Sequence, residues 1–371
     1  MIRRKAILYF AVFLLAITAV VPQGLLAQEN NGQPASFRLK RGTNISHWLS
    51  QSTRRGKDRA AFFTEKDVKA IASHGFDHIR IPVDEEQLWN EKNQPVKEGF
   101  QLLHDALQWC YLHRLSAVVD LHILRSHHFN AREKPLWTKP EAQERFLQCW
   151  RELSAELKRY PVTMLAYELM NEPVADSAEQ WNELLARGIQ VIREKEPERV
   201  IIIGSNKWQS VNTFAALKVP EHDKHIMLSF HYYNPFYLTH HMASWTKIRD
   251  YDGPVHYPGP TITQKELDAL PASIRNLLPG SDQPYNTALM EAQMQPAIQL
   301  AKKLQLPLYC GEWGCLNTVP RKDRLRWYKD VRKVLEKNGI AWSNWNYKSK
   351  GFGFVGDDGE LDKGLLKALV K

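Results

Sequence analysis

Eight short apolar segments alternate with helical patterns along this chain of 371 residues, and that alternation constrains the fold more than any other feature. Several segments, such as 200–203, are almost continuously apolar, which is typical of strands buried on both faces of a parallel sheet. Eight strands alternating with helices predict a single α/β domain with the (β/α)8 TIM-barrel fold. The predicted strands cover residues 38–44, 78–83, 117–122, 165–171, 200–204, 226–232, 307–312 and 340–345.

Between the predicted strands, apolar residues recur every three or four positions, which is the spacing of one helix face. Trp150 and Trp181 belong to such stripes, so we expect both indoles in the core. The crossover helix after the fifth strand is predicted to be short, near 210–217, and residues 244–288 form the longest irregular stretch. An open doubly wound sheet is the alternative fold. It usually begins with a Gly-rich phosphate-binding loop, whereas the first strand here ends Arg-Gly-Thr-Asn.

The first 27 residues have the three parts of a secretory signal peptide. Basic residues at positions 3–5 precede an apolar run of 16 residues, 6–21, and small residues around Ala27 end the segment. A membrane span needs about 20 apolar residues, so we expect cleavage near Ala27 rather than a membrane anchor. The mature protein is then secreted or periplasmic and not bound to a membrane. Residues 28–36 are expected to form a linker, and residues 37–371 one barrel domain.

The charge of the chain does not point to a nucleic-acid partner. The formal net charge of +9 falls to +6 once residues 1–27, which hold three basic and no acidic residues, are removed. The remaining basic residues are mixed with acidic ones, whereas a nucleic-acid surface gathers them on one face. We therefore expect no nucleic-acid binding.

Four cysteines, Cys110, Cys149, Cys310 and Cys315, remain in the predicted mature chain. Export permits disulfides, and four cysteines allow three complete pairings, among which the sequence does not choose. Buried free thiols are an equal alternative, because Cys110 and Cys149 lie on apolar helix faces. No C-x-x-C pair is present, which argues against a structural zinc site.

Two glutamates, Glu172 and Glu312, end apolar strand segments, where burying a charge is costly unless it is paired or used. They follow the fourth and seventh predicted strands, which lie on opposite sides of a closed barrel. Because the chemistry of such barrels sits at the carboxyl ends of the strands, we expect the two carboxyls to converge across the barrel mouth. Carboxyls about 5–5.5 Å apart are the geometry of retaining glycosidases. The alternative is that each carboxyl forms an ion pair with an arginine of the barrel.

The run Asn171-Glu172-Pro173 after the fourth strand resembles the signature of a large clan of (β/α)8 glycosidases. The fuller set of motifs resembles glycoside hydrolase family 5, which includes cellulases and mannanases, and the resemblance covers residues 38–348. It implies that Glu172 is the acid/base, that Glu312 is the nucleophile, and that residues 37–371 form a glycoside hydrolase catalytic domain. It implies no cofactor and no metal ion.

Six further residues match substrate-binding positions of that family, three of them on the second, third and fourth strands. Arg80 resembles the arginine that lies near the nucleophile, and Asn171 resembles the asparagine that binds the sugar 2-hydroxyl. His122 resembles the histidine after the third strand that binds sugar hydroxyls. His127 and His128 are the alternatives for this last position, but His122 continues the strand directly.

The other three matching residues lie on the sixth and eighth strands. His231 and Tyr233 share one strand face and resemble a His-x-Tyr motif, in which the histidine orients around the acid/base and the tyrosine hydroxyl bonds the nucleophile. Trp345 resembles the tryptophan that floors the cleavage subsite, where a flat indole contacts the apolar face of a pyranose. Loop aromatics that could line further sugar subsites are Trp137, Trp245, Tyr251 and Tyr257.

These residues predict a secreted, retaining β-glycoside hydrolase that cleaves a β-1,4-glucan such as cellulose or mixed-linkage glucan. Its expected partner is a β-linked polysaccharide or oligosaccharide, and we expect a monomer. Mannan, xyloglucan and short β-glucosides are alternative substrates.

Two other classes of protein remain open. One is a metal-dependent barrel hydrolase that uses histidine ligands, although barrels of that kind usually carry His-x-His on the first strand and none occurs here. The other is a non-catalytic carbohydrate-binding barrel. The histidines available to the first class are His122, His127, His128 and His231.

Overall fold

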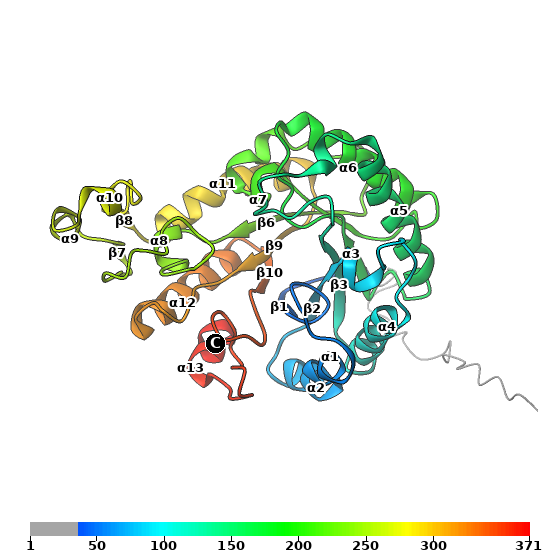
Figure 1. Cartoon of the computed structure of the whole chain (residues 1–371), viewed down its shortest axis with the longest axis horizontal. Coiled ribbons are helices and arrows are strands. Elements are labelled where there is room, and N and C mark those ends of the chain that lie inside the picture. Colours follow the sequence, from blue (N-terminus) through cyan, green and yellow to red (C-terminus); the bar gives the residue numbers. More distant parts are fainter. Residues whose placement is uncertain (1–35) are drawn as a thin grey trace, which may run out of the picture. The chain divides into compact units, whose positions relative to one another are not determined.

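Eight parallel strands close into a barrel in the computed structural model, which describes residues 36–371 (Figure 1). Strand β1 pairs with β10 on one side and with β2 on the other, so the sheet is closed. The predicted (β/α)8 barrel is therefore confirmed, and the doubly wound alternative is wrong. In spatial order the strands are β1 (Arg41–Asn44), β10 (Ala341–Asn344), β9 (Leu308–Trp313), β6 (Ile226–Tyr232), β5 (Ile201–Gly204), β4 (Leu165–Glu168), β3 (Ser116–Ile123) and β2 (His78–Asp84).

The fourth strand is shorter than predicted, and the difference shapes the barrel mouth. The prediction extends to residue 171, but β4 ends at Glu168. The backbone of Asn171 still donates a hydrogen bond to Leu121 O (3.1 Å). Glu172 then adopts a φ of 45°, in the left-handed region that residues other than glycine rarely enter. The chain turns out of the sheet at this point.

Helices cover the outside of the barrel, and two of the long ones begin at residues that favour a helix start. Helix α5 has Pro140 in its first turn, where the missing N–H is tolerated. The side chain of Ser177 caps α6 by accepting a hydrogen bond from the backbone of Gln180. Trp150 and Trp181 are buried, which confirms their place in the core. The helices before β5 are α1 (Gly56–Phe62), α2 (Glu65–Ser73), α3 (Glu85–Leu88), α4 (Lys97–Leu112), η1 (Pro135–Trp137), α5 (Pro140–Leu157) and α6 (Ala178–Arg193).

Short elements follow β5 and β6. The weak helix predicted near 210–217 is a 3₁₀ helix. The irregular stretch 244–288 holds a two-stranded sheet and two short helices, and in Figure 1 this segment extends outward beyond α8. Its Val255 and Ile262 are fully buried in the main apolar core. The remaining elements are α7 (Asn206–Gln209), η2 (Val211–Ala216), α8 (Phe236–Thr239), β7 (Gly259–Pro260), α9 (Gln264–Asp268), α10 (Ala272–Arg275), β8 (Pro284–Tyr285), α11 (Thr287–Leu304), α12 (Arg321–Lys337) and α13 (Lys363–Val370).

A buried cluster contributed by five neighbouring strands is separate from the main core. Side chains two positions apart point to the same face of a strand, so the next layer toward the carboxyl ends comes two residues later. On β3 and β4 that next layer consists of Asp120 and Glu168, both fully buried. The strands thus place acidic groups directly above an apolar layer. The cluster comprises Val118, Ala166, Ile202, Met227 and Tyr309.

All four cysteines are buried free thiols, which decides between the two alternatives that the sequence leaves open. Burial raises the pKa of Cys110 to about 12 and that of Cys315 to about 12. These thiols therefore act as small apolar groups in the packing rather than as crosslinks or nucleophiles.

The predicted signal peptide, residues 1–27, lies outside the described residues, as does all of the predicted linker except residue 36. Within residues 36–371, no helix is both long and apolar enough to cross a membrane.

Candidate active site

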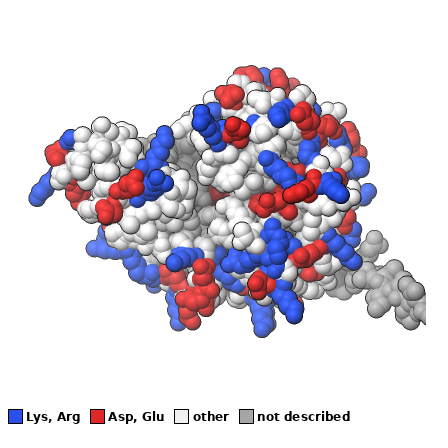
Figure 2. Space-filling view, viewed as in Figure 1, with Lys and Arg blue, Asp and Glu red and all other residues white. Residues whose placement is uncertain are grey.

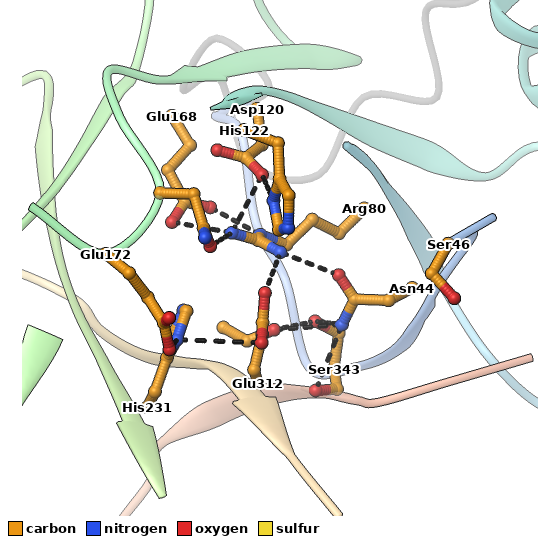
Figure 3. Close-up of polar contacts among 12 residues, drawn as sticks. Asn44, Ser46, Arg80, Asp120, His122, Glu168, Glu172, His231, Glu312 and Ser343 are labelled. Carbon is orange, nitrogen blue, oxygen red and sulfur yellow. Dashed lines mark hydrogen bonds and ion pairs between the residues drawn. The ribbon is translucent and has the colours of Figure 1, made fainter. Parts of the chain in front are cut away.

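Arg80 lies at the centre of a buried polar network at the carboxyl ends of the strands (Figure 3). Its guanidinium is fully buried. Nη1 donates to Oε1 of Glu312 (2.7 Å), and Nε donates to Oε2 of Glu168 (2.6 Å). Nη2 lies 3.0 Å from Oδ2 of Asp120. Three buried carboxyls thus converge on one permanent positive charge, and a planar guanidinium can bond several of them at once.

Two asparagines are the other direct hydrogen-bond partners of the Arg80 guanidinium. The side-chain carbonyls of Asn44 and Asn171 each accept a hydrogen bond from the guanidinium, both at 2.9 Å. Nδ2 of Asn44 also donates to the backbone oxygen of Gly311 (3.0 Å). Nδ2 of Asn171, by contrast, has no hydrogen-bond partner within residues 36–371 although it is buried. An amide held through its oxygen presents this free donor to a ligand, which fits the predicted contact to a sugar hydroxyl.

Glu172 and Glu312 converge as the sequence predicts. One carboxylate oxygen from each and one ring nitrogen of His231 all lie within 4.8 Å of one another. Glu312 is on β9, while Glu172 follows β4 in its left-handed conformation. Residues held in sparsely populated backbone conformations cluster at functional sites, because the surrounding structure must impose them. The carboxyls of retaining glycosidases are about 5–5.5 Å apart, so a contact within 4.8 Å between one oxygen of each is compatible with such a pair.

The two carboxyls differ in their electrostatic surroundings. Burial raises the pKa of Glu172 well above its usual value, and the neighbouring charge of Glu312 raises it further. Burial also raises the pKa of Glu312, but Arg80 and the hydroxyl of Tyr233 lower it. Glu172 therefore holds a proton to a higher pH than Glu312 does. Such a difference between two neighbouring carboxyls suits one of them to act as an acid and the other to act ionised.

His231 and Tyr233 each reach one member of the pair. Nδ1 of His231 lies 2.9 Å from Oε1 of Glu172, and the hydroxyl of Tyr233 donates to Oε2 of Glu312 at 3.0 Å. Burial lowers the pKa of His231 well below its usual value, so its ring is neutral at neutral pH. Gly311 leaves room for this ring, because a Cβ there would lie 3.3 Å from Nε2 of His231.

His122 and Trp345 lie face to face at one side of the site. Their rings are nearly parallel, with centroids 5.6 Å apart and an interplanar angle of 7°. Nδ1 of His122 lies 2.6 Å from Oδ2 of Asp120, and its Nε2 lies 3.0 Å from Nε2 of Gln51. Both nitrogens therefore have protein partners, and burial lowers the pKa of His122 to about 3. The structure thus places His122 as a neutral ring stacked on Trp345, and the predicted indole platform is itself buried, with only 7% of its surface exposed.

The comparisons with known proteins agree with this geometry. Residues 31–351 match the sequence model of the family described as Cellulase (glycosyl hydrolase family 5). The chain belongs to glycoside hydrolase family 5. It is 31% identical to Endoglucanase C of Acetivibrio thermocellus over 327 residues, which cover 86% of this chain and 94% of that protein. It is also 31% identical to Cellodextrinase A of Ruminococcus flavefaciens over 307 residues, covering 81% and 83% of the two chains.

Solved structures resemble this family 5 protein over most of its length. Thermotoga maritima Cel5A in complex with cellobiose superimposes with a TM-score of 0.72 at 25% identity, covering 90% of this chain and 97% of that one. The same Cel5A in complex with mannotriose gives a TM-score of 0.70 at 25% identity, with the same coverage. The protein is a glycoside hydrolase similar to endoglucanases.

Two members of the family 5 site are not assigned by the sequence. Asp120 and Glu168 bind Arg80 from inside the barrel, and burial raises the pKa of Asp120 to about 7. The alternation of side chains along a strand could have indicated that both acids point into the barrel, because each lies two positions after a residue of the buried apolar cluster. The arginine that contacts both acids is remote in sequence, so only the closed barrel brings the three side chains together.

The sequence also gives no role to the short segment Asn206–Gln209. This segment forms hydrogen bonds to residues on either side of Glu172 in the chain. The backbone N–H of Trp208 donates to the oxygen of Pro173 (3.2 Å). The side chain of Gln209 donates to Glu168 (3.0 Å) and to the backbone oxygen of Met170 (3.4 Å). Three consecutive residues, 207–209, have positive φ. The left-handed conformation costs about 1–2 kcal/mol per residue. Glycine is the residue that usually indicates it in a sequence, and none of the three is glycine.

Most of the predicted loop aromatics do not line the site. Tyr251 and Tyr257 are buried in the main core, so they are not open to sugar. Trp137 is also buried and packs against His127, with ring centroids 5.3 Å apart. Only Trp245 of the four is exposed, by 56%. The prediction failed for the other three because loop aromatics can equally fill the space beneath their own loops, which sequence periodicity does not show.

The four histidines of the metal-hydrolase alternative do not form one donor set. His122 bonds Asp120, while Nε2 of His127 lies 3.3 Å from the backbone oxygen of Glu172. Within residues 36–371, the one group with metal-ligand spacing is instead Glu172, His231 and Glu312. Carboxylate and imidazole ligands suit a divalent ion, so this set chemically fits a metal as well as a glycosidase pair.

Proposed function

We propose that this protein is a secreted, retaining endo-β-1,4-glucanase. The observation that carries the proposal is the pair Glu172 and Glu312, which lie within 4.8 Å and have unequal electrostatic surroundings. A retaining mechanism requires a nucleophile and an acid at this separation. The predicted signal peptide supports export.

In the first step, Glu312 attacks the anomeric carbon while Glu172 donates its proton to the glycosidic oxygen, which leaves on the released sugar. The bond from carbon to the leaving oxygen breaks as the bond to the Glu312 carboxylate forms. In the second step, Glu172, now ionised, takes a proton from water, and the water oxygen displaces Glu312. Arg80 and Tyr233 hold Glu312 by hydrogen bonds at 2.7 and 3.0 Å, which fixes the direction of attack.

A β-1,4-glucan is the proposed substrate for two reasons. The relatives are named endoglucanase and cellodextrinase, and Trp345, which stacks on His122 and keeps 7% of its surface exposed, is the indole that the sequence predicts to contact a pyranose. Mannan remains an alternative because Cel5A, at 25% identity, is described in complex with mannotriose as well as cellobiose. Xyloglucan and short β-glucosides complete the set of substrates to compare.

The test combines a substrate panel with variants of the carboxyl pair. Wild-type protein should release oligosaccharides from cellulose derivatives or mixed-linkage glucan faster than from glucomannan, xyloglucan or laminarin. Proton NMR should show that the first product keeps the β configuration. Glu172→Gln and Glu312→Gln should each lose most turnover, whereas Glu91→Gln, an exposed glutamate, should not. An α product at first appearance would contradict the retaining mechanism.

The donor set of Glu172, His231 and Glu312 favours one second candidate, a metal-dependent hydrolase. Exhaustive chelation followed by assay separates the two functions. Full activity after chelation supports the two-carboxyl mechanism, and loss that is restored by a divalent ion supports the metal. A non-catalytic binding protein would bind cello-oligosaccharides in calorimetry and release no reducing ends after long incubation.

A further inference from the structure

The loop that follows β1 brings one exposed side chain into contact with the buried network of the active site. Nε2 of Gln51 lies 3.0 Å from Nε2 of His122, and Gln51 is exposed whereas His122 is buried. Neither the sequence motifs nor the proposed mechanism gives Gln51 a role. The contact to His122 is the only hydrogen bond that its side chain forms within residues 36–371.

The backbone holds Gln51 in a rare conformation. Its φ is 51°, in the left-handed region that residues other than glycine seldom enter. Its N–H donates to Oδ2 of Asp84 (2.7 Å), and the N–H of Asp84 donates to the backbone oxygen of Leu49 (2.9 Å). Asp84 ends β2 and is buried. Such conformations persist where the surrounding structure imposes them, and they cluster at functional sites. The loop is therefore anchored in a form that lets the Gln51 amide reach His122.

The position of the ring proton on His122 follows from its other contact (Figure 3). Nδ1 lies 2.6 Å from Oδ2 of Asp120, and Nη2 of Arg80 lies 3.0 Å from the same oxygen. An oxygen that faces a guanidinium accepts hydrogen bonds. A proton taken up by Asp120 belongs on Oδ1, which has no partner within residues 36–371. Nδ1 of His122 is therefore the protonated nitrogen, and Nε2 carries the lone pair.

This lone pair decides which end of the Gln51 amide faces His122. An amide offers N–H donors on its nitrogen and an acceptor on its oxygen, and only the N–H end bonds a nitrogen that has a lone pair. The ring is then held at both edges, by Asp120 and by Gln51. Trp345 lies on the ring face, with centroids 5.6 Å apart and planes at 7°. Contacts at two edges and one face fix the orientation of the ring.

We propose that Gln51 is a positioning residue of the active site, which donates an N–H to Nε2 of His122 and thereby keeps the ring proton on Nδ1. The protonated Nδ1 donates to Asp120. Asp120 in turn contacts Arg80, which holds Glu312. Without the donated N–H the ring proton can move to Nε2, and the bare Nδ1 then repels the Asp120 carboxylate. The expected kinetic effect rests on the proposed function, whereas the position of the ring proton does not.

The kinetic test compares Gln51→Glu with Gln51→Ala on cellotriose. Glutamate has almost the shape of glutamine, but its ionised carboxylate only accepts hydrogen bonds, so it favours the tautomer with the proton on Nε2. In Gln51→Ala, kcat/KM should fall about threefold to tenfold, the value of one neutral hydrogen bond. In Gln51→Glu it should fall further. A side chain that only fills space predicts the opposite order. That order, or unchanged values in both variants, would overturn the proposal.

Thr53→Glu is the matched control for the added charge, because Thr53 is exposed two residues further along the same loop. On the face shown in Figure 2, basic and acidic side chains are interspersed and neither sign dominates, so one more carboxylate alters the surface charge little. Thr53→Glu should leave kcat/KM unchanged. A loss equal to that in Gln51→Glu would assign the effect to charge rather than to the tautomer, and would also overturn the proposal.

A spectroscopic test reads the ring proton directly and needs no turnover. Long-range proton–nitrogen correlation spectra distinguish a protonated ring nitrogen from one with a lone pair, and the His122 signals are those lost in His122→Asn. Wild-type protein should carry the proton on Nδ1, and Gln51→Glu should carry it on Nε2. A proton on Nε2 in the wild type, or on Nδ1 in Gln51→Glu, would overturn the proposal. A protein that shows the expected exchange but cleaves no glucan would contradict the proposed function and support the positioning role.

Discussion

The guanidinium of Arg80 contacts Glu312 at 2.7 Å while both groups are buried. Arg80 also holds Asp120 and Glu168, so three buried carboxyls share one cation in a region of low dielectric. Of these three, Glu312 is the one that also faces Glu172. The ion pair therefore does two things: it stabilises the barrel mouth, and it favours the ionised form of the proposed nucleophile.

We expect Arg80→Lys to damage both stability and activity. A lysine supplies one ammonium in place of a planar fork, so at least one buried carboxyl loses its partner. Breaking a buried pair costs about 3–5 kcal/mol. The free energy of unfolding, measured in urea, should fall by that order, and kcat should fall about a hundredfold or more. Arg321→Lys is the control, because Arg321 pairs with Asp362 at the surface, where such pairs contribute about 0–1 kcal/mol.

Tyr232 ends β6 and Tyr233 follows it, and their side chains contact different residues. The two residues therefore offer a matched pair of variants. The Tyr233 hydroxyl donates to Glu312, whereas the Tyr232 hydroxyl lies 2.6 Å from that of Tyr285. We expect Tyr233→Phe to lower kcat/KM about 10- to 100-fold, because hydrogen bonds to charged groups contribute about 1.5–3 kcal/mol. Tyr232→Phe should instead lower the melting temperature and leave kcat/KM nearly unchanged. The reverse pattern would contradict the role of Tyr233.

The barrel was predictable because eight apolar runs, each too short for a helix, recur with helical stripes between them. The convergence of Glu172 and Glu312 followed from that topology, and the paired contacts of His231 and Tyr233 followed from their spacing of two on one strand. The alternation of side chains along β4 also predicts that Glu168 points into the barrel. Its role could not be predicted, because that requires knowing that Arg80 lies next to it.

Loops were less predictable, because their conformations depend on contacts between distant segments. Trp137 is buried because it packs on His127 and Trp181, two contacts that no local pattern encodes. The left-handed run 207–209 has no glycine, so its sequence does not differ from that of an ordinary turn. Hydrogen bonds to the segment around Glu172 stabilise this run. The two segments are far apart in sequence and become neighbours only in the folded barrel.

Gln209 offers a test of how that run positions Glu172. Its amide bonds Glu168 and Met170, and Gly204 is required beside it because a Cβ there would lie 2.5 Å from Cγ of Gln209. Gln209→Ala should misplace Glu172 and impair proton donation. General acid catalysis contributes about 100-fold or more, so turnover of cellotriose should fall at least tenfold. A dinitrophenyl cellobioside, whose leaving group needs no proton, should be affected much less.

The control for this variant is Gln101→Ala, which removes an exposed side chain that bonds only Asp105. Neither substrate should respond to it. Equal losses on both substrates in Gln209→Ala would indicate general damage to the barrel mouth rather than displacement of the acid.

Asp84 should make stability depend on pH. Burial raises its pKa from 3.8 to about 7. Between these values the folded chain holds a proton that the unfolded chain releases, so this group lowers the free energy of unfolding as pH rises from about 4 to 7. Asp84→Asn keeps an acceptor for the backbone of Gln51 and cannot ionise. Its unfolding free energy relative to wild type should therefore rise over that range by about 2–4 kcal/mol, and Asp250→Asn, at an exposed position, should show no such rise.

The pH dependence of catalysis should follow from the unequal carboxyls. Glu312 must be ionised to attack, so kcat/KM should increase as pH rises through its pKa. Glu172 must be protonated to release the leaving group, so kcat/KM should decrease as pH rises through the higher pKa of that residue. The profile on cello-oligosaccharides should therefore be bell-shaped, and His231, whose pKa burial lowers well below its usual value, should add no limb near neutral pH. With a dinitrophenyl cellobioside the first step needs no proton from Glu172, and the alkaline limb should disappear while the acid limb stays. An alkaline limb that persists with this substrate would assign it to a group other than Glu172.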